Sequence, residues 1–174
     1  TENNDGTFTI LDTTGFDGVD TLINVEFAVF VDRTIDLDNL PFVFTEGNDV
    51  GSGTAGDDVL NGLGGNDVIN GLAGDDTING GDGADRLIGG EGADALNGDA
   101  GFDSADYRTA SSAIAFNVLT GGTLGDALGD TFSSIERFYL SDFDDVVTGT
   151  DANEFFFGED GNDTINGGGG VDRI

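Results

Sequence analysis

The sequence contains no cysteine and no histidine, and it also has no lysine, methionine or tryptophan. Without cysteine and histidine the chain can form no disulfide, no zinc, copper or haem site of the usual kind, and no Ser-His-Asp or Cys-His catalytic group. Only oxygen ligands remain for a metal, and oxygen ligands favour hard cations such as calcium.

Positive charge is almost as scarce. The chain has five arginines against 35 acidic residues, for a net charge of −30. The arginines are scattered, so we expect no nucleic-acid binding, and an anionic membrane surface would repel the chain. We also expect no membrane insertion, because no apolar run approaches a transmembrane length. No signal-peptide pattern is present, and the sequence begins at Thr1, so we expect a piece of a longer protein.

Glycine, aspartate and asparagine dominate what is present, and these residues favour turns over helices. From residue 44 the sequence divides into seven units of nine residues, with Gly at the fourth and Asp at the sixth position of every unit. The units are FTEGNDVGS, GTAGDDVLN, GLGGNDVIN, GLAGDDTIN, GGDGADRLI, GGEGADALN and GDAGFDSAD. A second run from residue 140 reads LSDFDDVVT, GTDANEFFF, GEDGNDTIN and GGGGVDRI. A disordered tract would give no reason for this period.

The spacing predicts a coil of two units. Positions 7 to 9 form a short strand whose middle side chain points inward, and positions 1 to 6 reverse the chain. The inward residues are Leu60, Ile69, Ile78, Leu87, Leu96, Val147, Ile165 and Ile174. Equivalent positions two units apart would then stack at one strand spacing, about 4.8 Å. Two carboxylates at that distance repel each other unless a cation lies between them.

These repeats resemble the hemolysin-type calcium-binding (RTX nonapeptide repeat) proteins, whose pattern is G-G-x-G-x-D-x-U-x. The resemblance implies an all-β fold, a right-handed parallel β-roll that is a calcium-loaded solenoid with flanking and connecting β segments. It also implies Ca2+ as the bound ion, held by sixth-position carboxylates and loop carbonyls. The implied metal ligands are Asp49, Asp58, Asp67, Asp76, Asp85, Asp94, Asp103, Asp145, Glu154, Asp163 and Asp172.

Stacking two units apart predicts five carboxylate pairs in the first run, namely Asp49/Asp67, Asp67/Asp85, Asp85/Asp103, Asp58/Asp76 and Asp76/Asp94. In the second run we expect Asp145/Asp163 to be the better site, because Glu154/Asp172 replaces Asp by the longer Glu. Ala152 also stands where Gly belongs, and we expect it to resist the turn geometry. An EF-hand, the rival calcium motif, has no match here.

Four segments follow from the pattern: an N-terminal β cap at 1–43, a first roll block at 44–106, a connecting β segment at 107–139 and a second, truncated block at 140–174. We expect strands at 7–12 and within 23–38, and in the connecting segment around 113–119 and 129–140. Asp126 and Asp130 lie in Gly-rich turns; they offer a further ligand, but we favour solvated side chains there. Phe155 and Phe157 flank the inward Phe156, and we favour packing under a neighbour over partner binding.

The expected function is that of a calcium-binding module of a larger secreted bacterial protein, located outside the cell or at its surface, that folds on extracellular calcium and stabilises the exported protein. The resemblance implies the type I secretion machinery as a partner. The alternative is a structural or adhesive extracellular protein of the surface-layer or matrix type, with self-association or surface glycan contact. We expect no enzymatic activity, because the carboxylates belong to a repeating ladder.

Overall fold

The computed structural model describes residues 7–11, 19–23 and 44–174, and the chain divides into two units, Thr1–Asp36 and Leu37–Ile174. In the first unit, β1 (Thr7–Leu11) pairs antiparallel with β2 (Val19–Ile23). The strand expected at 7–12 is confirmed. The second expected strand, within 23–38, lies almost wholly outside the described residues, and so does any contact that would make residues 1–43 a cap.

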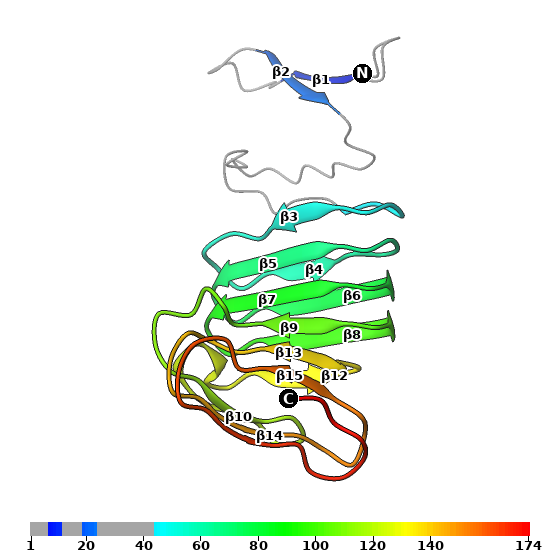
Figure 1. The fold of residues 1–174 in the computed structure, drawn as a ribbon. Helices are drawn as coiled ribbons and strands as arrows, with labels where there is room; N and C mark the ends of the chain where they lie inside the picture. The colour runs from blue at the N-terminus through cyan, green and yellow to red at the C-terminus, as the bar shows by residue number, and fades with distance from the viewer. Residues whose placement is uncertain (1–6, 12–18, 24–43) are drawn as a thin grey trace. The chain divides into compact units, whose positions relative to one another are not determined.

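The second unit is a parallel β-solenoid, as expected (Figure 1). The first block supplies β3 (Val50–Ser52), β4 (Val59–Asn61), β5 (Val68–Ala73), β6 (Thr77–Gly83), β7 (Arg86–Glu91), β8 (Ala95–Gly101) and β9 (Ser104–Asp106). Alternate units belong to two different sheets, and each strand pairs in parallel with the strand 18 residues later, as in Val50↔Val68 and Thr77↔Ala95. One coil of the solenoid therefore consumes two nine-residue units.

The interior strands are longer than the expected three residues. Pairing between β5 and β7 continues from the strand into the turn, where Leu72 lies opposite Gly90, and β6 and β8 pair as far as Gly83↔Gly101. The turns extend the ladder because each turn stacks on an identical turn one coil away. Turns as well as strands therefore hold consecutive coils together.

The connecting segment continues the solenoid. It contains β10 (Ala115–Asn117), β11 (Gly121–Leu124), the short 3-10 helix η2 (Gly125–Ala127), β12 (Thr131–Ser133) and β13 (Arg137–Tyr139). β12 pairs with β8, and β13 pairs with β9, both in parallel. The region expected to form one strand around 129–140 thus forms two, with the buried Ile135 between them. The second block adds β14 (Val146–Thr148), β15 (Phe155–Phe157) and β16 (Thr164–Asn166).

A single column of inward side chains forms the core. Leu60, Ile69, Ile78, Leu87 and Leu96 are at most 2% exposed, as the period predicts. The column becomes aromatic beyond the first block, where Phe116, Phe132, Phe138 and Phe156 contact one another with ring centroids 5.0–5.5 Å apart. Ile174 is an exception to the prediction, since it is 77% exposed and follows the last bridge, Phe155↔Arg173. Within the described residues, no helix has the length and apolar character needed to cross a membrane.

The fourth-position glycine is needed where a six-residue turn of the same kind lies 18 residues before it. Gly65 has φ +112°, and a Cβ on it would lie 2.5 Å from the carbonyl carbon of Gly47 in the preceding coil. Neither Phe143 nor Ala152, which occupy this position in the opening units of the second block, has a positive φ. The expectation that Ala152 resists the turn geometry is therefore wrong, because an opening unit does not adopt that geometry.

Candidate metal centre

The sixth-position carboxylates form two continuous ladders along the edges of the solenoid. In each step, the backbone N–H of one aspartate donates to Oδ1 of the aspartate 18 residues later. The donor–acceptor distances are 2.8–2.9 Å for the pairs Asp49/Asp67, Asp67/Asp85, Asp85/Asp103, Asp58/Asp76 and Asp76/Asp94. These are the five predicted pairs, so the structure brings together the residues that the period places together.

The second carboxylate oxygen is left without a partner in the middle of each ladder. Oδ2 is buried and accepts no hydrogen bond from any described residue in Asp67, Asp76, Asp85, Asp94 and Asp103. These five side chains are only 1–2% exposed. A buried carboxylate oxygen without a donor is costly, so each of these oxygens calls for a proton or a cation.

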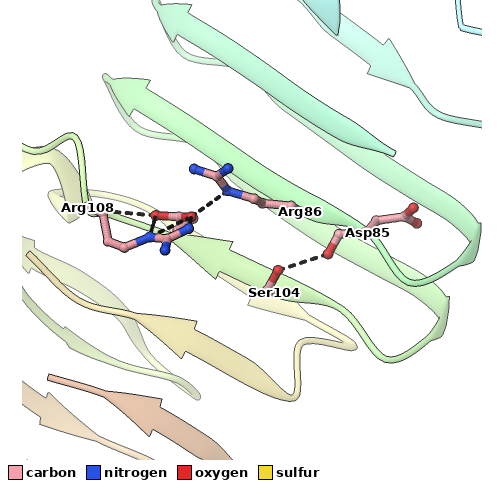
Figure 2. A network of polar contacts seen from close by, with 5 residues as sticks. Asp85, Arg86, Ser104 and Arg108 are labelled. Atoms are coloured by element: carbon pink, nitrogen blue, oxygen red, sulfur yellow. Dashed lines mark hydrogen bonds and ion pairs between the residues drawn. The ribbon is translucent and has the colours of Figure 1, made fainter. Parts of the chain in front are cut away.

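Arginine does not supply the missing charge. Both ion pairs in the described part of the chain involve Asp106, whose Oδ2 lies 2.5 Å from Nε of Arg86 and 2.6 Å from Nη2 of Arg108. Burial alone would raise the pKa of Asp106, but hydrogen bonds from Arg108 and the charges of both arginines hold it below its usual value. Figure 2 shows the Asp85 carboxylate pointing away from this cluster, while Ser104 Oγ donates to the Asp85 carbonyl at 3.0 Å.

Burial disfavours the charged form of the ladder aspartates. It raises the pKa of Asp94 and of Asp103 to about 6, and the charges of neighbouring aspartates add to the increase. The pKa values of Asp67, Asp76 and Asp85 are raised for the same reasons. The hydrogen bond from the preceding coil opposes this shift without cancelling it, so the ladders carry more negative charge than the protein itself stabilises.

Each unpaired oxygen borders a small space above the first-position glycine of its own unit, which we call a cradle. A Cβ built on Gly62 would lie 2.6 Å from Asp67 Oδ2 and 2.2 Å from the Gly80 carbonyl oxygen of the next coil. On Gly80 it would lie 2.5 Å from Asp85 Oδ2 and 3.0 Å from the Gly98 carbonyl oxygen. The absence of a side chain thus leaves a carboxylate oxygen and a carbonyl oxygen close together.

This donor set fits calcium, which takes carboxylate and backbone carbonyl oxygens. No three acidic side chains converge on one point within the described residues, so side chains alone would not hold an ion there. The loop carbonyls therefore have to contribute, and the cradles place them beside the unpaired carboxylate oxygens.

Threonine or serine satisfies the carboxylate in the units that open each block. Thr45 and Thr54 donate both N–H and hydroxyl to Oδ2 of Asp49 and Asp58, at 2.5–2.9 Å. In the second block, Asp145 accepts hydrogen bonds from Ser141 N–H, Ser141 Oγ and the N–H of Ile114. Both oxygens of Asp145, and Oδ2 of Asp49 and Asp58, therefore have protein donors, whereas Oδ2 of the interior aspartates has none.

In the second block, the two expected pairs differ in how far the protein satisfies their carboxylates. Asp145 N–H donates to Asp163 at 3.0 Å, but Asp145 itself is already satisfied, and Asp163 is half-buried. Glu154 N–H donates to Asp172 at 3.1 Å, and Glu154 is 2% exposed with Oε2 unpaired, while Thr150 donates to Oε1. By the criterion of an unpaired buried oxygen, Glu154 is the stronger candidate.

Sequence reasoning missed two members of the ladders, both in the connecting segment. The expectation that Asp130 is solvated is wrong: it is fully buried, accepts the Asp94 N–H at 2.8 Å, and burial raises its pKa to about 7. Glu136 accepts the Asp103 N–H at 3.0 Å. The sequence does contain a sign of both residues. In the repeats an acidic residue stands two positions before an inward apolar residue, and the same spacing separates Asp130 from Phe132 and Glu136 from Phe138. Asp126 is half-buried and belongs to neither ladder.

The outward phenylalanines contact other rings of the chain, although Phe157 remains 43% exposed and is not covered by a neighbour. The Phe155 ring meets Phe102 edge-on at 5.3 Å, and Phe157 stacks on Tyr139 at 4.8 Å. The guanidinium of Arg173 lies 5.2 Å from the Phe155 ring centroid, where a cation–π contact adds to the packing.

Comparison with known proteins agrees with this geometry. The family model described as RTX calcium-binding nonapeptide repeat (4 copies) matches residues 45–78, 71–105 and 139–174, more than half of the chain. No curated protein matches the chain. RTX repeats bind Ca2+ and are typical of secreted proteins. With its nine-residue period, parallel solenoid and stacked aspartates, the chain belongs to the RTX calcium-binding nonapeptide repeat family.

Proposed function

We propose that this chain is a calcium-dependent folding module of a larger secreted bacterial protein. The observation that carries the proposal is the set of five buried aspartates whose Oδ2 has no hydrogen-bond donor. A module built to fold without metal would satisfy these oxygens, as the chain does with Thr45, Thr54 and Ser141 in its opening units. Unpaired carboxylate oxygens remain in the interior of the first-block ladders and at Glu154.

The physical basis is charge repulsion between coils. Two carboxylates one strand spacing apart, about 4.8 Å, repel each other by about 3.5 kcal/mol at an effective dielectric constant of about 20. This cost is repeated at every step of the ladder. Bound calcium supplies positive charge that neutralises the carboxylates. The chain's contribution is to aim Asp67 Oδ2 and Asp85 Oδ2 at the carbonyl oxygens of Gly80 and Gly98.

Metal binding of this kind supplies free energy of folding, because the unfolded chain has no preformed site. We propose that the chain leaves the cell unfolded through a type I secretion machinery and folds outside, where calcium is abundant. There it stabilises the protein that carries it. We also propose that it has no catalytic activity, since its buried acids are committed to stacking the coils.

Circular dichroism with and without calcium tests the proposal. In excess chelator the spectrum should be that of a largely unfolded chain, and millimolar calcium should restore the β signal. Magnesium serves as the matched divalent control and should do much less, because it demands a tight octahedron and gives up its waters reluctantly. Native β structure in chelator, with no calcium in the purified protein, would contradict the proposal.

A further inference from the structure

The end of the first ladder carries a cradle that the repeat pattern does not predict. A Cβ built on Gly98 would lie 2.6 Å from Asp103 Oδ2 and 2.1 Å from the carbonyl oxygen of Ser134. Asp103 is 1% exposed and its Oδ2 has no hydrogen-bond partner. The oxygens match those of the Gly62 and Gly80 cradles, but one comes from the connecting segment, outside the residues that match the repeat family.

The strand register explains how Ser134 reaches this position. β12 pairs with β8 through Ser133↔Asn97, which brings Ser134 opposite Gly98, the first position of its unit. β13 then pairs with β9 through Arg137↔Ser104. Three residues, 134–136, therefore replace the six residues 98–103 of the coil before. Ser134 has φ +52°, a left-handed conformation that lets the shortened turn reverse direction.

Glu136 completes the shortened turn as a ladder member. Its Oε2 accepts the N–H of Asp103 at 3.0 Å, the role that an aspartate Oδ1 has in every earlier step. The additional methylene of glutamate suits a turn with three fewer residues. A second acidic side chain therefore flanks the Gly98 cradle from the connecting segment.

The opposite edge of the solenoid ends differently. Asp130 closes that ladder, and its Oδ2 accepts a hydrogen bond from the hydroxyl of Tyr107 at 2.6 Å. Both oxygens of Asp130 are therefore satisfied by protein donors, one by Tyr107 and the other by the N–H of Asp94. The counterpart of Asp103 on this edge is Asp94, whose Oδ2 is also unpaired. The three atoms nearest to a Cβ built on Gly89 all belong to Asp94, whereas the Gly98 cradle also presents the Ser134 carbonyl oxygen.

From this difference we infer that the connecting segment completes one additional calcium site, with Asp103 Oδ2 and the Ser134 carbonyl as ligands and Glu136 beside them. This site rests on the proposed calcium function and adds to the five pairs within the first block. Its consequence is that the connecting segment is fastened to the first block by an ion as well as by strand pairing.

The test counts the calcium ions bound to the intact chain by native mass spectrometry at saturating calcium. Ser134→Pro removes the left-handed φ, because proline fixes φ near −65° and so turns the carbonyl away. Ser134→Gly is the matched control, since glycine accepts φ +52°. Asp99→Asn is a second control, because it removes a carboxylate at an exposed position outside the ladders. Circular dichroism in calcium establishes that each variant is folded.

Ser134→Pro should bind one calcium ion fewer than the wild type, while Ser134→Gly and Asp99→Asn should bind the same number. A crystal structure in calcium should place an ion about 2.3–2.6 Å from Asp103 Oδ2 and the Ser134 oxygen. A wild-type count in Ser134→Pro, or a crystal structure in calcium with no ion between Asp103 Oδ2 and the Ser134 oxygen, would overturn this inference and leave the proposed function intact. A wild-type chain that binds no calcium would overturn the proposed function itself.

Discussion

Replacing Asp76 by Asn tests whether Asp76 is a calcium ligand or a residue that only supports the fold. Asp76 is 2% exposed, its Oδ1 accepts the Asp58 N–H at 2.8 Å, and its Oδ2 has no partner. Asparagine keeps the Oδ1 acceptor and the shape of the side chain, but it removes the negative charge. The variant should therefore retain the ladder hydrogen bond and lose the cation.

The magnitude follows from binding linkage. A site at 100 times its dissociation constant stabilises the folded state by about 2.7 kcal/mol, and each further tenfold increase in calcium adds about 1.4 kcal/mol. Asp76→Asn should thus lower the slope of unfolding free energy against log calcium by about 1.4 kcal/mol per decade. At low calcium the variant should be the more stable protein, because an unsatisfied buried group costs about 1–3 kcal/mol.

Urea denaturation followed by circular dichroism, at a series of free calcium concentrations, measures this slope. Asp99→Asn is the matched control, with the same charge change at an exposed position whose φ of +63° asparagine tolerates. Its slope should equal that of the wild type. If Asp76→Asn lowered stability equally at all calcium concentrations, Asp76 would be a structural residue and the ligand assignment would be wrong.

Three further outcomes are expected. Ile78→Ala should destabilise the calcium-loaded protein by about 2–5 kcal/mol in urea denaturation, because the side chain is fully buried in a one-column core. In chelator, the β signal in circular dichroism should increase as pH falls from 7.5 to 5, because the folded-state pKa of Asp94 and Asp103 is about 6, above the unfolded value, and protonation relieves the buried charge. A β signal that falls over this range would refute the prediction. In hydrogen exchange during a calcium titration, the amides of residues 53–97 should become protected at lower calcium than those of residues 149–174, because the first block holds more unpaired carboxylate oxygens. Simultaneous protection of both blocks would count against this prediction.

Local periodicity was enough to predict the coil, its two edges and its inward column. A nine-residue unit places the same side chain at the same point of every coil, so the stacking of Asp58 on Asp76 and the burial of Ile69 follow from spacing alone. Such predictions hold as long as the neighbour of each residue is an identical residue 18 positions away.

Only the tertiary structure showed where the stacking of residues 18 positions apart ends. Asp130 joins the ladder 36 residues after Asp94, and Glu136 joins 33 residues after Asp103, because the insertion and the shortened turn change the spacing between stacked units. The sequence also could not reveal which carboxylates have protein donors. That outcome depends on whether a hydroxyl such as that of Tyr107 lies within hydrogen-bonding distance, and only the folded chain brings Tyr107 to Asp130. The period determined which carboxylates stack, whereas hydroxyls at particular places, such as those of Thr45 and Tyr107, determined which carboxylates have protein donors.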